Sequence, residues 1–194
     1  MRKGIITALI ISMLLIFSGC GQETAPAREK DPDLHYEIPE FLDVVFDSAS
    51  AKKKDGFSID ASHSSEGYIG ARGTSSKRLK LQVIQGDTTY SYDLPNDGTI
   101  CFYPLQSGNG EYTVRIMENI KESKYGEKVS VKTKVKMKDE FQPFLHSSLY
   151  VNYTKDMECV KKARELAENS MDANDFIAEV YVFISSSIKY DKTK

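Results

Sequence analysis

Cysteine and histidine are the side chains in this sequence best suited to nucleophilic chemistry, and there are three of each. Cys159 is expected in the first turn of a helix, close to Lys161 and Lys162, a setting that favours the thiolate form. His63 and His146 are its candidate general bases. The preferred interpretation is a partly buried helical cysteine with no chemistry, because buried thiols behave as small hydrophobic side chains. The sequence therefore predicts no catalytic residue.

The same residues do not predict a metal or cofactor site. The three histidines are scattered, with no paired spacing and no second cysteine nearby, so no zinc site and no other metal site is expected. No Gly-rich phosphate loop is present, and no cofactor is expected. Cys101 and Cys159 either form a disulfide that closes a loop of about 58 residues or stay unpaired. Spacing alone does not bring two β-carbons within bonding reach, so both alternatives stand.

Cys20 is the cysteine whose surroundings specify a modification. The sequence begins MRKGIITALIISMLLIFSGC, in which two basic residues precede an apolar run that small residues close. This order is typical of a secretory signal. The run is shorter than the roughly 20 residues that a membrane-spanning helix needs. Residues 1–20 are therefore predicted to be a signal peptide that ends at Cys20.

The end of this segment resembles the lipobox of bacterial lipoproteins, with Phe17 in place of the usual leucine. In such proteins the cysteine is acylated, becomes the new N-terminus and anchors the chain. The resemblance implies lipid attachment at Cys20, membrane lipid as a partner, and a place on the extracytoplasmic face of the cell membrane. A plain secretory signal with an incidental cysteine is the alternative.

Composition bounds the class of protein. Removing Arg2 and Lys3 with the signal lowers the basic count from 26 to 24, against 28 acidic residues, so the mature chain is mildly acidic. Neither this balance nor any arginine cluster indicates nucleic-acid binding. The 40% of apolar residues, with 11 Tyr and 9 Phe, can build the core of one ordinary domain or two small ones.

Apolar and polar residues alternate with a period of two through most of residues 56–138, which predicts strands. Seven short strands are expected, near residues 57–59, 68–69, 78–85, 88–94, 99–103, 111–118 and 128–138. Turn residues such as Gly86-Asp87 and Asn96-Asp97-Gly98 separate them. The pattern predicts a mainly β chain with an immunoglobulin-like antiparallel β-sandwich. Lys132, Lys134 and Lys136 are expected on a solvated outer face that discourages edge pairing, with a basic binding stripe as the alternative.

Two segments flank this domain. Residues 21–55 are predicted to be a tether and connecting segment, with a flexible polar part up to Asp33. A short helix is expected after Pro39, ending at Lys52–Lys54, and an extended edge segment is the alternative. Residues 139–194 are predicted to be an aromatic connector and two helices. Thr154 or Asp156 would cap the first helix and Asp172 the second.

The second of these helices is expected to have a broad apolar face between Phe176 and Ile188, with few charges after Glu179. Such a face needs a partner surface along most of its length. One short helix and the connector offer little cover for it.

Several stretches of the chain resemble the bacterial transglutaminase-like lipoproteins. They are DEFQPFL (139–145), YVNYT (150–154), ECVKKA (158–163), IKYD (188–191), KRLKLQVIQGDTTYSYDLPNDGT (77–99) and GNGEYTVRIMEN (108–119). The resemblance implies a β domain followed by the two leading helices of an incomplete transglutaminase-like domain. In that family the catalytic Cys, His and Asp follow the position that matches IKYD, so no catalytic residue is carried over.

Two functions remain in competition. The first is a membrane-anchored, non-catalytic lipoprotein that acts as a surface binding or spacer module for an envelope protein or a glycan. The second is the N-terminal part of a transglutaminase-like or cysteine-protease-like enzyme that performs acyl transfer or amide hydrolysis. For the chain as given, both imply no activity of the transglutaminase type.

Overall fold

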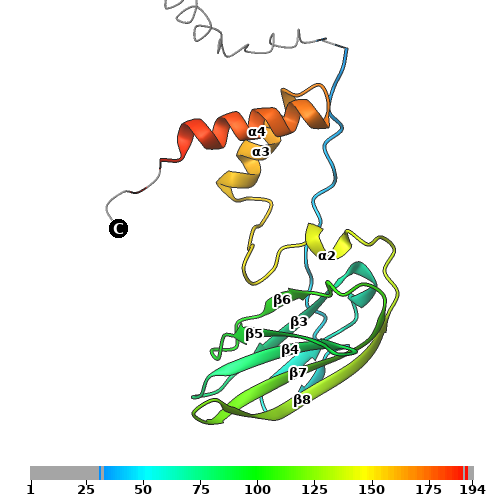
Figure 1. The fold of residues 1–194 in the computed structure, drawn as a ribbon, viewed down its shortest axis with the longest axis vertical. Helices are drawn as coiled ribbons and strands as arrows, with labels where there is room; N and C mark the ends of the chain where they lie inside the picture. The colour runs from blue at the N-terminus through cyan, green and yellow to red at the C-terminus, as the bar shows by residue number, and fades with distance from the viewer. Residues whose placement is uncertain (1–30, 32, 190, 192–194) are drawn as a thin grey trace, which may run out of the picture.

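The structure is a computed structural model that describes residues 31, 33–189 and 191 (Figure 1). Within this part of the chain, eight strands form two four-stranded antiparallel sheets. The first sheet has the order β1 (Lys52–Lys54), β2 (Phe57–Asp60), β3 (Tyr68–Gly73) and β6 (Cys101–Pro104). The second has the order β5 (Thr88–Leu94), β4 (Leu79–Gln85), β7 (Gly110–Lys121) and β8 (Lys124–Val135). Helices follow, so the predicted mainly β chain with a sandwich and C-terminal helices is confirmed.

The core lies between the two sheets, and alternation along the strands fills it. In β4, Leu79, Leu81 and Val83 are buried, whereas Lys80 and Gln82 between them are partly exposed. Successive side chains of a strand point to opposite faces of the sheet, so this alternation gives the sheet one face buried in the core and one face exposed to solvent. The other buried core residues on the second sheet are Tyr92, Leu94, Tyr112, Val114, Ile116, Val129 and Val135.

The edge strand β8 carries Lys132 and Lys134 of the lysine row, and Lys136 follows the end of the strand. Lys132 and Lys134 are exposed, and β8 has a neighbour on one side within its sheet. Lys128 is engaged, because its Nζ lies 3.2 Å from a carboxylate oxygen of Glu118. Exposed lysines at an edge disfavour pairing with another strand, and this position fits a solvated outer face.

The first sheet differs because both of its faces are covered. All four residues of β2 are buried, and so are Tyr68, Ile69, Gly70 and Ala71 of β3. Phe46 lies against the outer face, where a β-carbon at Gly70 would come within 2.6 Å of Cδ2 of its ring. Arg72 also contacts this ring, with its guanidinium 5.6 Å from the ring centroid. Gly70 therefore permits a close approach that any larger residue would block.

Phe46 ends a segment, residues 34–46, that we call the strap. The strap forms neither helix nor strand, so the helix predicted after Pro39 is wrong. Its aromatic residues contact different parts of the molecule: Tyr36 stacks on Phe176, Phe41 packs edge-on against Tyr153, and Phe46 covers Gly70. One helical face cannot reach three such separated surfaces, whereas an extended chain can.

A turn joins the strap to the sandwich. Oδ1 of Asp47 accepts a hydrogen bond from the amide of Ala49 at 2.8 Å, and Oδ2 accepts one from the Ser50 hydroxyl at 2.6 Å. These bonds hold the pKa of Asp47 below its usual value, with the Ser50 bond as the largest cause. The residues expected to end a helix, Lys52–Lys54, instead form β1 and pair with β2. The sandwich thus begins inside the segment predicted as connecting chain.

In the described part of the chain, three α-helices follow the sandwich. They are α2 (Gln142–Leu145), α3 (Glu158–Glu168) and α4 (Ala173–Ser187). Asp172 caps α4 as predicted, because its side chain accepts a hydrogen bond from the amide of Asp175 at 2.9 Å. The predicted cap of α3 is wrong: Met157 occupies the cap position, and no side chain bonds there. Among the described residues, no helix is both long and apolar enough to cross a membrane.

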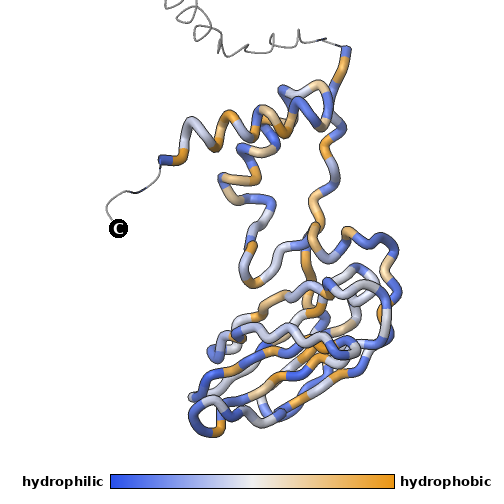
Figure 2. Tube along the Cα trace, viewed as in Figure 1, coloured by the Kyte–Doolittle hydropathy of each residue, from blue (hydrophilic) through white to orange (hydrophobic). Residues whose placement is uncertain are grey.

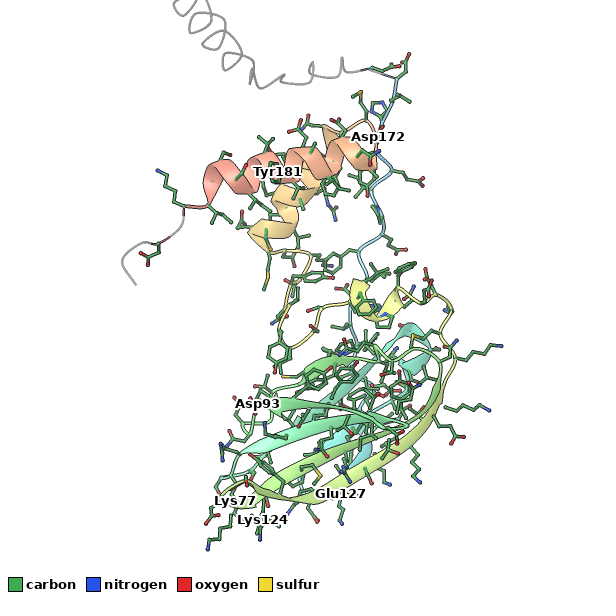
Figure 3. The ribbon with its side chains drawn as sticks, in the orientation of Figure 1. Lys77, Asp93, Lys124, Glu127, Asp172 and Tyr181 are labelled. Carbon is green, nitrogen blue, oxygen red and sulfur yellow. The ribbon has the colours of Figure 1, made fainter. Side chains whose placement is uncertain are left out.

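We call α3 and α4 the helical pair, and the chain between β8 and α3 the connector. The helical pair and the sandwich lie at opposite ends of the molecule, joined by the strap and the connector (Figure 1). Asp172 and Tyr181 mark α4 at one end, whereas Lys77 and Lys124 lie at the far end of the sandwich (Figure 3). The described N-terminal end lies beside the start of α4, since the amide of Tyr36 donates to the carbonyl of Ser170 at 2.9 Å.

The contact between Phe46 and Gly70 yields a prediction about stability. Gly70→Ala should destabilise the fold by about 1–3 kcal/mol, because the added methyl group meets the Phe46 ring. In a Phe46→Ala background the same substitution should cost far less, since the obstructing ring is gone. Urea unfolding of the four proteins of this cycle measures the coupling. Equal costs in both backgrounds would contradict the contact.

Candidate functional site

The predicted lipid-attachment residue, Cys20, lies outside the described residues, as do the rest of the signal sequence and residues 21–30. The candidate residues inside the described part are Cys101, Cys159, His63 and His146. Their positions decide whether the nucleophile and base considered from the sequence can act together.

Cys159 lies in the first turn of α3 and is exposed, not partly buried as predicted. The lysines expected to favour its thiolate are paired elsewhere. Lys161 lies 2.7 Å from a carboxylate oxygen of Glu158, and Lys162 lies 2.7 Å from one of Glu165. Their charge is therefore shared with carboxylates and is not directed at the sulfur.

His63 and His146 lie at the sandwich, where both rings contact Tyr68. The His63 ring stacks on the tyrosine ring at 5.2 Å between centroids, and the His146 ring lies at 4.7 Å. Cys159 instead lines a groove between α3 and α4, in the helical pair. The structure therefore does not bring the thiol together with either candidate base.

Cys101 lies on β6 within the core and is 8% exposed. Burial raises the pKa of its thiol, so the unreactive form is favoured. Both Cys101 and Cys159 are free thiols, so the disulfide alternative is not realised. Cys101 behaves as the small hydrophobic residue that the other alternative described.

Tyr68 is the centre of a buried cluster that sequence patterns did not reveal. Its side chain is 2% exposed, and its hydroxyl accepts a hydrogen bond from the strap amide of Val45 at 3.2 Å. Burial raises the pKa of this phenol. Asp60, 1% exposed, accepts bonds from the amide of Asp47 at 2.7 Å and from the Ser62 hydroxyl at 2.6 Å. The cluster fastens the strap to the sandwich, and its polar groups are used for structure.

His146 closes the cluster from the connector side and is 7% exposed. Its Nε2 lies 3.3 Å from Oε1 of Gln142, and its Nδ1 is buried with no hydrogen-bond partner in the described part of the chain. Burial lowers the pKa of this imidazole, and the nearby Glu66 carboxylate offsets the effect only in part. Folding therefore favours the neutral form of His146.

An exposed apolar surface lies on the helical pair. No residue of α4 is buried, and Ile177, Tyr181, Val182, Ile184 and Ile188 are exposed, with Tyr181 at 72%. Beside them lies an open groove of about 570 Å³. Its lining comprises Glu158, Cys159, Lys162, Ala163 and Leu166 from α3 with Val180, Phe183, Ile184 and Ile188 from the α4 side. The predicted need of this helix for a partner surface is met only in part, by α3 and the strap residue Tyr36.

The lining of this groove is suited to binding, not to chemistry. Its charged side chains come from α3, and between Val180 and Ile188 the chain carries no charge. Hydrophobic residues recur along α4 (Figure 2), and several of them are exposed. Apolar patches of this kind mark interaction sites in soluble proteins. The described residues contain no group of three metal-ligating side chains.

Comparisons with known proteins add no relative: no protein-family model, curated protein or solved structure matches this chain.

The buried state of His146 predicts how stability depends on pH. An imidazole whose pKa is lowered by folding binds fewer protons in the folded than in the unfolded chain. Stability should therefore fall as the pH drops below the ordinary value of 6.5. His146→Gln should flatten the dependence of the melting temperature on pH between about 7 and 5. An unchanged slope in this variant would show that another group is responsible.

The different environments of the two thiols predict selective alkylation. Iodoacetamide should modify Cys159 quickly in the native protein, because its sulfur is on an exposed helix turn. Cys101 should react only after unfolding, because it is buried with a raised thiol pKa. Peptide mass mapping over a time course distinguishes the sites. Modification of Cys101 at a comparable native rate would contradict the closed sandwich core.

Proposed function

We propose that this chain is an extracytoplasmic lipoprotein, anchored to the cell membrane through Cys20, that acts without catalysis as a surface binding or spacer module. The observation that carries the binding role is the exposed apolar face of α4 with its groove against α3. The anchoring role is supported by the lipobox-like end of the first twenty residues.

The absence of a catalytic role is supported by the positions of the possible reactants. Cys159 lies in the helical pair, and the two candidate bases pack on Tyr68 at the sandwich. Nucleophilic catalysis requires the base within hydrogen-bonding reach of the nucleophile. In this proposal the sandwich is a rigid body and the helical pair supplies the binding surface.

The second candidate is that the chain forms the N-terminal part of a transglutaminase-like or cysteine-protease-like enzyme. The exposed face of α4 favours it, because residues of this kind commonly pack inside a larger core. Under this candidate the described helices are structural, and the catalytic residues are encoded beyond the codon for Lys194. Sequencing the gene past this codon tests it. An open frame that encodes a downstream Cys and His supports this candidate, and unrelated sequence after a stop codon opposes it.

Acylation of Cys20 gives the direct test of the first candidate. In a bacterial host fed with radioactive palmitate, the wild-type chain should carry label in the membrane fraction. Cys20→Ser should carry none, because the thiol that accepts the lipid is gone. The matched control is Cys159→Ser, which removes an exposed cysteine and should leave labelling unchanged. Label that persists in Cys20→Ser would refute the anchor.

A further inference from the structure

We propose that the exposed apolar side of α4 lies on the surface of the lipid bilayer, so that the helical pair is the membrane-contacting end of the protein. This inference deepens the proposed function, since it rests on the anchor at Cys20. It assigns a partner of stated chemistry, a phospholipid surface, to a face that the described residues leave uncovered.

The exposed side chains form a continuous stripe along α4. At 3.6 residues per turn, Ile177, Tyr181, Ile184 and Ile188 fall within a sector of about 60°. They are 64%, 72%, 47% and 68% exposed, respectively. The stripe adjoins the groove against α3, which continues the apolar surface sideways. An amphipathic helix that lies in the plane of a membrane presents such a face to the boundary of head groups and acyl chains.

Two hydroxyls in the last turns of α4 suit contact with lipid. Ser185 donates its hydroxyl to the carbonyl of Val182 at 3.1 Å, and Ser186 donates to that of Phe183 at 3.2 Å. Hydroxyls bonded to their own helix do not need water. The ring of Tyr181 combines an apolar body with a polar tip, which is the combination enriched at membrane interfaces. Lys189 follows the stripe and is exposed, where it can meet anionic head groups.

The described chain begins beside this helix. The amide of Asp31 donates to the sulfur of Met171 at 3.0 Å, and the Tyr36 ring stacks on Phe176 at 5.1 Å. The chain from the anchored cysteine therefore enters the fold at the start of α4, away from the sandwich (Figure 1).

The distances allow the stripe to reach the bilayer. Eleven peptide steps separate Cys20 from Asp31, and they span at most about 40 Å. The 15 residues of α4 are about 22 Å long. Every turn of the helix therefore lies within reach of a bilayer that holds Cys20. A short tether keeps its two ends at an effective concentration on the order of millimolar, so even weak interfacial affinity gives lasting contact.

Fluorescence of an introduced indole tests the contact, because the sequence contains no tryptophan. The full-length acylated protein with Tyr181→Trp is reconstituted into vesicles of phosphatidylcholine and phosphatidylglycerol, with or without dibrominated acyl chains. Burial of the face to about 5–10 Å should give a blue-shifted emission that the brominated lipid lowers roughly twofold. The matched control is Tyr150→Trp, since Tyr150 is similarly exposed at 70% but lies on the connector near Tyr92. Its emission should stay unquenched.

A third variant tests whether the apolar stripe itself causes the quenching. Adding Ile177→Gln and Ile184→Gln to Tyr181→Trp should remove the quenching, because the stripe loses two of its apolar members. Both positions are exposed and glutamine favours helix, so the fold should persist, which circular dichroism checks. Quenching that survives this change would overturn the assignment of the stripe.

Palmitate labelling of the same preparations separates failure of this inference from failure of the proposed function. A labelled protein whose indole at position 181 is quenched no more than the control overturns the bilayer contact and leaves the anchor intact. A blue shift without bromolipid quenching also overturns it, because another protein surface then covers α4. An unlabelled protein whose indole is quenched by added vesicles retains the contact and refutes the anchor.

Discussion

The cover over the outer face of the first sheet is the constraint on which the rest of the structure depends. The segments that precede and follow the sandwich in sequence supply this cover. Phe46 of the strap packs on Gly70, and His146 of the connector packs beside Tyr68. The amide of Leu149 also donates to the carbonyl of Phe102 on β6 at 3.0 Å. The strap and the connector both continue to the helical pair, so the contacts that bury this sheet also hold the two segments that lead to the helices.

The strands could be predicted because their local pattern and their final environment agree. β5 has the predicted bounds, and β4 alternates between core and solvent as its sequence does. The strap could not be predicted, because Tyr36, Phe41 and Phe46 each satisfy a contact far away in sequence. The burial of Asp60 could not be predicted for a related reason. A polar residue in a strand is expected to face solvent, yet Asp60 is buried and its carboxylate accepts hydrogen bonds from Asp47 and Ser62.

The possible chemistry could be evaluated from the sequence only in part. Residue types made Cys159 a possible nucleophile, and chain order did not tell where a base would lie. The fold separates them, since the two histidines serve aromatic packing at one end and the cysteine lines a groove at the other. The uncovered side of α4, by contrast, could be predicted from its sequence. α4 has fifteen residues and is rich in apolar side chains, and one neighbouring helix of eleven residues is too short to cover them all.

The route by which the strap enters the fold also sets the direction in which the protein resists force. A pull on the N-terminal end of the described chain meets the Asp31–Met171 contact first, and then the Tyr36–Ser170 hydrogen bond and the stacked Phe176 ring. It reaches the Phe46 contact and β1 only after the strap has lifted. These contacts are loaded one after another and not all together, so each breaks separately at a low force. The strap would thus absorb a pull before the sandwich carries any load.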